Sequence, residues 1–225
     1  MDSELMDWDS IYREEGGFPG PPPWNIGEPQ PELAALIRDG KLTGVVLDAG
    51  CGHAELSLTL AAAGSTVVGI DLSPTAIAAA AKAAEERGLS SATYLCADIT
   101  SFTGYDGRFD TIVDSTLFHS LPVEARDAYL SSIHRAAAPG AKLYVLVFAK
   151  GAFPPHLEAT PNEVDEDELR SAVSKHFVID DIRPAYIHAY QPEIPDVPAA
   201  AAPFGLDDKG RTKLPAFLLS AHNEA

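Results

Sequence analysis

The sequence predicts an α/β fold, namely a doubly wound, mostly parallel, Rossmann-like sheet of seven strands with helices on both faces. Short apolar runs alternate with segments of helical spacing along most of the chain. The runs are apolar throughout, which is typical of parallel strands that are covered on both faces. Strands that are separated by helices form βαβ units and hence a mostly parallel sheet. We expect the last strand to run antiparallel.

The first half of the chain shows this alternation most clearly. Apolar residues keep helical spacing from Leu33 to Gly40, and glycine suits the position after a helix end. The pair Ser73-Pro74 places an N-cap and a first-turn proline at the start of an alanine-rich helix, which Gly88 ends. The expected elements are a helix over residues 33–40, a strand over 45–47, a helix over 56–64, a strand over 66–70, a helix over 73–88 and a strand over 92–96.

The second half continues the pattern. The turn-like Tyr105-Asp106-Gly107 precedes an apolar run, and Pro139-Gly140 stops a helix. The expected elements are a strand over residues 109–113, a helix over 123–137, a strand over 142–148, a helix over 166–175, a strand over 177–182 and a last strand over 214–221.

Two segments fall outside the alternation. Residues 1–30 hold both tryptophans of the protein, Trp8 and Trp24, among glycines and prolines. We expect this acidic tail to fold back onto an apolar surface, either for packing or for binding. Residues 190–213 contain four prolines among alanines, and proline-rich segments do not join central strands. We expect them to form a loop, inserted before the last strand, that helps to cover the site.

The composition limits the classes of function. The chain has 225 residues, of which 46% are hydrophobic, and its 16 basic and 33 acidic side chains give a net charge of −17. This is a globular composition, and the acidic excess disfavours nucleic-acid and membrane partners, because both need clustered Lys and Arg. Cys51 and Cys96 form no metal-binding or disulfide pattern, so we expect two buried thiols in a reducing compartment. We expect a cytoplasmic monomer or homodimer.

The residues that follow the first four strands carry the functional signal. In open α/β sheets, ligands bind outside the carboxyl ends of the strands. The two glycines of the first such end allow a sharp turn and a close approach of backbone N–H groups to a ligand. The four ends are Asp48-Ala49-Gly50-Cys51-Gly52, Asp71, Asp98-Ile99 and Asp114-Ser115. They predict a ligand site along one edge of the sheet.

The spacing of these residues indicates which ligand fits. Asp71 follows Gly50 by 21 residues, a spacing that places its carboxylate near both ribose hydroxyls of a nucleoside. Asp98 is placed to accept from an adenine amino group, while Asp48 and the end of the fourth strand are placed to face a positively charged head group. Glu55 stands where a dinucleotide-binding loop needs a small residue, so it would repel a pyrophosphate. S-adenosylmethionine, which has positive centres and no phosphate, suits this edge.

Three ordered stretches resemble the class I S-adenosylmethionine-dependent methyltransferases, namely Val46–Gly52, Val68–Pro74 and Ala97–Ile99. The likeness covers about residues 30–150. Many members of the family carry a third glycine where this chain has Ala54, and alanine is also small. The resemblance therefore implies that the chain binds S-adenosylmethionine and releases S-adenosylhomocysteine.

A closer resemblance concerns one group within that family. The segments Trp24–Gln30 and Phe109–Ser120 are similar to a mycobacterial-type group that methylates hydroxyquinolone-type heterocyclic toxins and quinones on oxygen. This resemblance implies a methyltransferase domain over residues 31–225 and a lid over residues 1–30 that helps to enclose the cofactor. The predicted cofactor-binding residues are Trp24, Gln30, Asp48, Gly50, Gly52, Asp71, Leu72, Asp98, Ile99, Asp114 and Ser115.

The transfer itself needs few groups from the protein. A sulfonium methyl is already electrophilic, so positioning and desolvation supply most of the rate. His119 follows the fourth strand and is the candidate general base for a protonated acceptor. Aromatic residues are expected to form a pocket for a flat heterocycle, and they are Trp8, Tyr12, Phe18, Phe118 and Phe204. The sequence shows no set of metal ligands.

Three alternatives remain open at this point. A thiol- or thiopurine-type S- or N-methyltransferase shares the same motifs. A non-catalytic protein that binds S-adenosylmethionine has the same fold, because fold does not fix function. A nicotinamide-dependent oxidoreductase also uses such a sheet, although Glu55 argues against it. The partner that the sequence favours is a small aromatic acceptor.

Overall fold

One sheet organises the part of the chain that the computed structural model describes, residues 7–15, 21–153, 161–191 and 203–224. Its seven strands lie in the order β3-β2-β1-β4-β5-β7-β6. All strand pairs from β3 to β5 are parallel, and β7 runs antiparallel to both β5 and β6. The strands are β1 (Val45–Ala49), β2 (Thr66–Asp71), β3 (Ala92–Cys96), β4 (Phe109–Ser115), β5 (Ala137–Phe148), β6 (Val178–Ala189) and β7 (Thr212–His222). The predicted fold class and the antiparallel last strand are confirmed.

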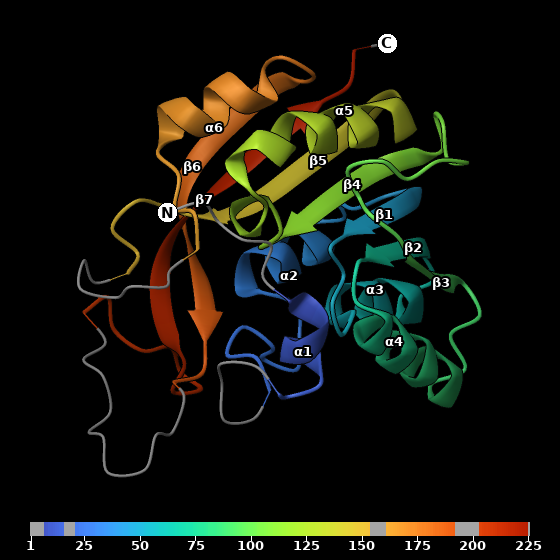
Figure 1. Ribbon diagram of the computed structural model, residues 1–225, viewed down its shortest axis with the longest axis horizontal. Helices are drawn as coiled ribbons and strands as arrows, with labels where there is room; N and C mark the ends of the chain where they lie inside the picture. Colours follow the sequence, from blue (N-terminus) through green and yellow to red (C-terminus); the bar gives the residue numbers. More distant parts are fainter. Residues whose placement is uncertain (1–6, 16–20, 154–160, 192–202, 225) are drawn as a thin grey trace.

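Helices cover both faces of this sheet (Figure 1). On one face, α5 and α6 pack against β1, β4 and β5 through Tyr129, Ile133 and Leu169. On the other, α2 and α3 contribute Leu33 and Leu60 to a second core, and α4 packs beside α3. The helices are α1 (Trp8–Tyr12), α2 (Pro31–Arg38), α3 (Glu55–Ala62), α4 (Pro74–Glu86), α5 (Arg126–Ala136) and α6 (Glu166–Val173), with short 3-10 turns at Phe118–Ser120 and Val123–Ala125.

Side chains fix the starts of α4 and α6. The Ser73 hydroxyl accepts the N–H of Ala76 at 3.1 Å, and Pro74 occupies the first position of α4, as the sequence predicted. The Asp165 carboxylate accepts the N–H of Glu168 at 2.7 Å and caps α6. The helix α3 begins without a side-chain cap, directly after a residue in a left-handed conformation.

The strands β6 and β7 are longer than the sequence predicted. The strand β6 continues to Ala189 although it contains Pro184, because it is an edge strand that pairs with β7 alone and tolerates a missing donor. The partner of Phe148, the last residue of β5, is Ala216, so β7 residues 212–215 lie beyond the β5 ladder and pair with β6. These two strands therefore extend beyond the carboxyl end of β5 (Figure 1), and we call this part the β6–β7 overhang, residues 186–189 and 212–215.

The amino-terminal segment contains a helix that the sequence analysis did not predict. The Asp7 carboxylate accepts the N–H of Ser10 at 3.1 Å and caps α1. One oxygen of Asp9 accepts the Ser73 hydroxyl at 2.6 Å and the Thr75 N–H at 3.0 Å. A carboxylate at a helix N-terminus is favourable, so this contact docks α1 on the start of α4.

Gly69 in β2 offers a test of the packing beneath the sheet edge. A Cβ on this residue would lie 2.7 Å from the Tyr94 ring and 2.8 Å from the Cys51 sulfur. We expect Gly69→Ala to lower the free energy of unfolding by about 1–3 kcal/mol, the usual cost of overpacking, in urea denaturation. If the clash is the cause, a Tyr94→Leu background should remove the part of that loss that is due to the ring and leave the part due to Cys51, whereas an undiminished loss would contradict it.

Candidate active site

The carboxyl ends of four strands meet along one edge of the sheet. Because β3, β2, β1 and β4 are neighbours in this order, the residues that follow them lie side by side. The strand order reverses between β1 and β4, which is the point where open α/β sheets bind ligands. The structure therefore brings the predicted acidic and glycine positions to a common edge.

The glycine turn after β1 is tied to the end of β2. The N–H groups of Gly50 and Cys51 both donate to the Ile70 carbonyl, at 2.8 and 3.1 Å. The Gly52 N–H donates to Asp71 Oδ2 at 2.8 Å. Gly50 and Gly52 have φ of 68° and 51°, a conformation that favours glycine. The turn thus has the tight geometry that the sequence predicted.

Asp71 is positioned by backbone donors. Besides the Gly52 N–H, its carboxylate accepts the Ser73 N–H at 2.9 Å, and the side chain is buried. Burial raises the pKa of this carboxyl, which penalises the charged form in the absence of a partner. These backbone bonds use part of the acceptor capacity of a carboxylate, so Asp71 retains acceptor sites for ribose hydroxyls.

The flanking residues fit the rest of a nucleoside. Leu72 leaves 54% of its surface exposed beside Asp71, and such a side chain offers an apolar face to a flat ring. Asp98 is exposed, and only its Oδ1 accepts from Thr100, at 2.7 and 2.8 Å. Ile99 is buried behind it. A free carboxylate oxygen, an apolar face and the Asp71 carboxylate are the chemistry that adenosine requires, so the residues fit the predicted cofactor.

Asp48 and Asp114 do not face a common head group. In the register of β1 and β4, Asp48 pairs with Val113 and Ala49 pairs with Asp114. Since adjacent residues of a strand point to opposite faces, the two carboxylates lie on opposite sides of the sheet. The expectation that both contact one positively charged group therefore needs correction.

Each of these two carboxylates has its own partners. The Ser57 hydroxyl donates to Asp48 Oδ2 at 2.5 Å, and burial, together with repulsion from Asp71, raises the pKa of Asp48 to about 6. Asp48 is on the α3 side, near the glycine turn, and a cationic ligand would relieve that repulsion. Burial raises the pKa of Asp114 to about 7.

Asp114 fixes the turn that follows β4. Its Oδ1 accepts the N–H groups of Leu117 and Phe118 at 2.8 and 3.2 Å, and its Oδ2 accepts the Tyr129 hydroxyl at 2.8 Å. A Cβ on Gly50 would lie 2.9 Å from the Leu117 side chain. Asp114 therefore places Leu117 against the glycine turn and holds the loop rather than the ligand. Ser115, the next residue along the edge, is half-buried.

Thr116 is a residue of this turn that the sequence analysis missed. Its φ is 75°, which is unusual for a β-branched residue and marks local strain. The Thr116 N–H donates to the Leu146 carbonyl at 3.0 Å, and its carbonyl accepts the Ser120 hydroxyl at 3.0 Å. No sequence pattern distinguishes a strained threonine from an ordinary one, so only coordinates reveal it.

The amino-terminal segment lies over the glycine turn. A Cβ on Gly52 would lie 2.6 Å from the Tyr12 hydroxyl, and the Tyr12 ring meets His53 edge-on with ring centroids 5.0 Å apart. Burial and the nearby Asp71 raise the pKa of Tyr12, so its hydroxyl stays neutral. The Asn25 side chain contacts His53 Nδ1 at 3.0 Å. This contact lies at the edge where the lid was predicted.

Trp24 and Gln30 differ in what they contact. Trp24 meets Trp8 edge-on with ring centroids 6.2 Å apart and hydrogen bonds to Tyr12. Gln30 Oε1 accepts the His188 N–H at 2.8 Å, and its Nε2 donates to the His188 carbonyl at 3.0 Å. Gln30 thus attaches the segment to β6, and its predicted role at the cofactor stays a prediction.

His119 is buried with one ring nitrogen occupied. The Phe148 N–H donates to its Nδ1 at 3.2 Å, so in the neutral ring the proton sits on Nε2. Burial and the nearby Arg126 lower the pKa of His119 to about 3. Both observations oppose protonation of the ring, which a general base must accept. The base role stays a prediction, and these contacts weigh against it.

The predicted aromatic pocket is only partly assembled. Trp8 and Tyr12 lie together on α1. Phe118 is fully buried in the core, under the Arg126 guanidinium at 4.7 Å, so it cannot contact an acceptor. Phe204 is 38% exposed in the segment before β7, and Phe18 lies outside the described residues. Phe118 was misassigned because an apolar residue near a strand end can point to either side of the sheet.

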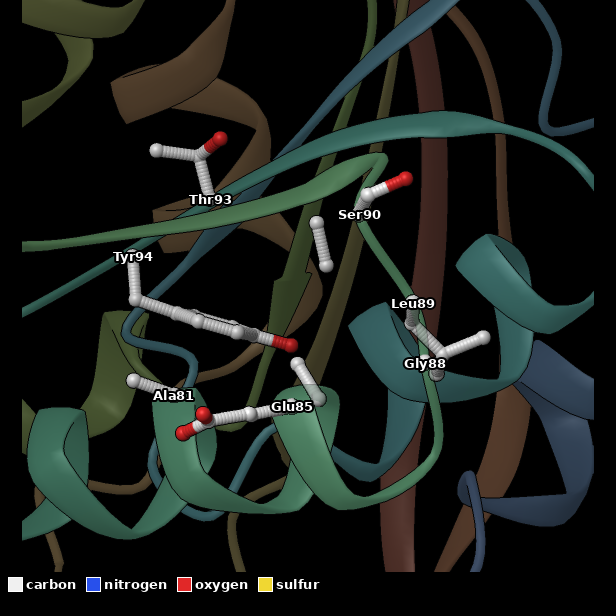
Figure 2. A pocket seen from close by; sticks show the side chains of 9 residues that line it. Ala81, Glu85, Gly88, Leu89, Ser90, Thr93 and Tyr94 are labelled. Atoms are coloured by element: carbon white, nitrogen blue, oxygen red, sulfur yellow. The ribbon is translucent and has the colours of Figure 1, made fainter.

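A pocket of about 510 Å³ lies at the other end of β3. Figure 2 shows Tyr94 reaching from β3 across α4. The Tyr94 hydroxyl is buried, and no residue in the described part of the chain forms a hydrogen bond with it. Because Gly88 and Ala92 lie at the amino end of β3, this pocket is separate from the edge described above. The residues that line it are Ala81, Ala84, Glu85, Gly88, Leu89, Ser90, Ala92, Thr93 and Tyr94.

Two classes of site are not seen in the described ranges. Among these residues no group of three or more His, Cys, Asp or Glu side chains is arranged to hold a metal ion. No helix within the same part of the chain combines the length and apolar character that a membrane crossing requires.

Comparisons with known proteins agree with this geometry. Residues 46–140 match the family described as "Methyltransferase domain". The chain is 50% identical over 228 residues to the 2-heptyl-1-hydroxyquinolin-4(1H)-one methyltransferase of Mycobacteroides abscessus, and the alignment covers 100% of both. It is 30% identical over 132 residues to the probable thiol methyltransferase 2 of Arabidopsis thaliana, covering 57% of this chain and 58% of that protein.

A solved structure extends the likeness to the whole fold. It is described as "Conversion of a Disulfide Bond into a Thioacetal Group during Echinomycin Biosynthesis" and is 33% identical in sequence, with a TM-score of 0.83. The superposition covers 98% of this chain and 92% of that one. The overhang and the amino-terminal segment therefore lie within the region of similarity.

Proposed function

Because the chain belongs to the class I S-adenosylmethionine-dependent methyltransferases, we propose that it transfers a methyl group to an oxygen of a hydroxyquinolone-type heterocycle. One observation carries the choice of acceptor, namely the 50% identity over the full length of both chains to a hydroxyquinolone methyltransferase. Likeness over half of the chain would support methyl transfer without indicating an acceptor.

The residues of the sheet edge have defined tasks in this proposal. S-adenosylmethionine, when bound, supplies an electrophilic methyl group on a positively charged sulfur. Asp71 holds the ribose hydroxyls, Asp98 accepts from the adenine, and Leu72 packs against its ring. Asp48, whose pKa of about 6 leaves it mostly ionised at neutral pH, contributes negative charge near the glycine turn. Residues 1–30 act as the lid of the domain formed by residues 31–225.

The acceptor needs little activation. An N-hydroxyquinolone is acidic and reaches the site partly ionised, so exclusion of water and alignment of its oxygen are the main requirements. Tyr12 lies against Gly52 of the glycine turn, Trp24 contacts both Tyr12 and Trp8, and such an aromatic cluster suits a flat heterocycle. We infer that His119 shapes this region through its bond to Phe148.

His119→Asn tests this inference. Asparagine can still accept the Phe148 N–H but cannot take up a proton. We expect kcat to fall less than about tenfold, with the pH dependence of kcat unchanged, because the ring is neutral in the parent. The measurement is a pH–rate profile with a hydroxyquinolone acceptor. A fall of about 10²-fold or more with a displaced profile would restore the base role.

The proposed function is tested by acceptor-dependent formation of S-adenosylhomocysteine. Turnover with 2-heptyl-1-hydroxyquinolin-4(1H)-one, and little with the matched quinolone that lacks the N-hydroxyl, would support it. Equal rates with both quinolones would place the methyl group elsewhere. Cofactor binding without turnover of any acceptor would indicate the non-catalytic alternative.

A sulfur acceptor is the second candidate. The solved structure that matches with a TM-score of 0.83 concerns the conversion of a disulfide into a thioacetal group. A probable thiol methyltransferase also matches part of this chain. We therefore include an aromatic thiol in the same panel. A kcat/KM for the thiol above that for the hydroxyquinolone would favour S-methylation.

The class of partner, the oligomeric state and the cellular location of the enzyme are also proposals. The net charge of −17 supports a small-molecule acceptor over nucleic acid. We propose a monomer or homodimer, to be distinguished by light scattering during size-exclusion chromatography. A cytoplasmic location rests on the two-cysteine composition alone.

A further inference from the structure

An ion network, buried at Arg211 and Asp207 and partly exposed at Glu28, joins the amino-terminal segment to the β6–β7 overhang. Arg211 lies just before β7, with a side chain that is 3% exposed. Its Nε donates to Asp207 Oδ2 at 2.6 Å, and its Nη1 donates to Glu28 Oε1 at 2.6 Å. Asp207 Oδ2 also contacts His188 Nδ1 at 2.7 Å. One guanidinium thus bridges a carboxylate of the overhang side and a carboxylate of the amino-terminal segment.

Backbone bonds run beside this network. The Tyr190 N–H donates to the Pro23 carbonyl at 2.9 Å, and Gln30 binds both backbone groups of His188. Residues 23 to 30 are therefore held at both ends against β6. The residues between these ends include Trp24 and Asn25, which contact Tyr12 and the glycine turn.

The energetics favour a positioning role over a stabilising one. Removing the Arg211 guanidinium and the Asp207 carboxylate from water is costly, and apolar residues of similar volume stabilise a fold as well or better. Buried ionic groups are best attested where they fix one register among several. Here the register concerns how residues 23–30 lie across the edge that holds the cofactor.

We propose that Arg211 is a positioning residue for the reaction, acting through Glu28 to hold the amino-terminal segment over the bound cofactor. Arg211 binds Glu28, which belongs to the same short segment as Trp24 and Asn25. Trp24 contacts Tyr12 and Asn25 contacts His53, and Tyr12 lies against Gly52. Its loss loosens the cover and lowers cofactor affinity. This inference depends on cofactor binding by the family and is independent of the acceptor.

Glu28→Ala is the main test, because Glu28 is 37% exposed and its loss spares the fold better than loss of Arg211. The matched control is Glu32→Ala. Glu32 pairs with Arg183 at 2.6 Å and also joins the amino-terminal half to β6, but it lies in α2, away from the glycine turn. Calorimetry with S-adenosylhomocysteine gives the Kd, and steady-state kinetics give KM for S-adenosylmethionine and kcat.

We expect Glu28→Ala to raise the Kd and the KM for the cofactor at least tenfold, with kcat at saturating cofactor within threefold of the parent. Glu28→Gln, which keeps an acceptor for Arg211, should recover part of the loss. Glu32→Ala should change the Kd less than twofold, even though we expect it to lower the Tm about as much as Glu28→Ala does. Hydrogen exchange should show faster exchange confined to residues 21–30 in Glu28→Ala.

Two outcomes would overturn the proposal. One is a Kd for Glu28→Ala within twofold of the parent. The other is a rise in Kd that Glu32→Ala shares in proportion to its loss of Tm, since this would reflect stability alone. A failed acceptor assay would leave the binding measurements interpretable, so the two proposals fail separately.

Discussion

Asp71→Ala should weaken S-adenosylhomocysteine binding by about 1–3 kcal/mol, or roughly 5- to 150-fold in Kd. The carboxylate accepts two backbone N–H groups, from Gly52 and Ser73, and in the proposed complex it also accepts the ribose hydroxyls. Alanine removes the ribose contacts and, at the same time, the acceptor of the Gly52 N–H that holds the glycine turn. Isothermal titration calorimetry with the purified variant measures the change.

Two further variants separate these effects. Asp71→Asn keeps an acceptor oxygen for one N–H and should lose less affinity than alanine. Asp98→Ala removes a carboxylate from the same edge but disturbs only the local contacts with Thr100. We expect Asp98→Ala to lose less affinity for S-adenosylhomocysteine than Asp71→Ala does. Wild-type affinity in Asp71→Ala would show that this residue does not contact the cofactor.

The fold was predictable because its signals are local. The apolar runs at 45–47 and 66–70 and the Ser73-Pro74 cap each report burial or capping within a few residues, and the structure has β1, β2 and α4 there. The end of β6 was not predictable in this way. Its polar residues and Pro184 break the apolar pattern, and the strand forms only because β7 pairs along its whole length.

The site was predictable in position but not in the direction of each side chain. Asp48 and Asp114 end neighbouring strands, yet their register places them on opposite faces. Phe118 follows the same strand and turns into the core, while Thr116 takes a strained conformation. Spacing along the chain shows which residues reach the edge, but the pleat and the turn geometry decide what each one contacts.

The Arg211 network could not be predicted from the sequence, for a different reason. Asp207 and Arg211 have the spacing of an ordinary ion pair within one turn. Glu28, the third member, is more than 170 positions away along the chain. Long-range pairs of this kind leave no periodic signal, and a single sequence gives no covariation to reveal them.

Asp114→Asn should make the stability of the protein less dependent on pH. The pKa of Asp114 is about 7 in the folded protein, against 3.8 for the free group. A raised carboxyl pKa means that the folded state holds its proton longer than the unfolded state, so this contribution to stability is lost as pH rises from about 4 through 7. Three pKa units correspond to about 4 kcal/mol. Asparagine does not titrate, so Asp114→Asn loses no stability from this source as the pH rises.

We therefore expect the Tm of Asp114→Asn relative to the parent to rise between pH 5 and pH 9, by several degrees, at about 2–4 °C per kcal/mol for a chain of this size. The asparagine oxygen can still accept from Leu117 and Phe118, so the turn is kept. Asp110→Asn, an exposed position on the same strand whose oxygen binds the Val45 N–H, provides the control. A Tm difference that stays constant across this range would show that burial does not shift the protonation of Asp114.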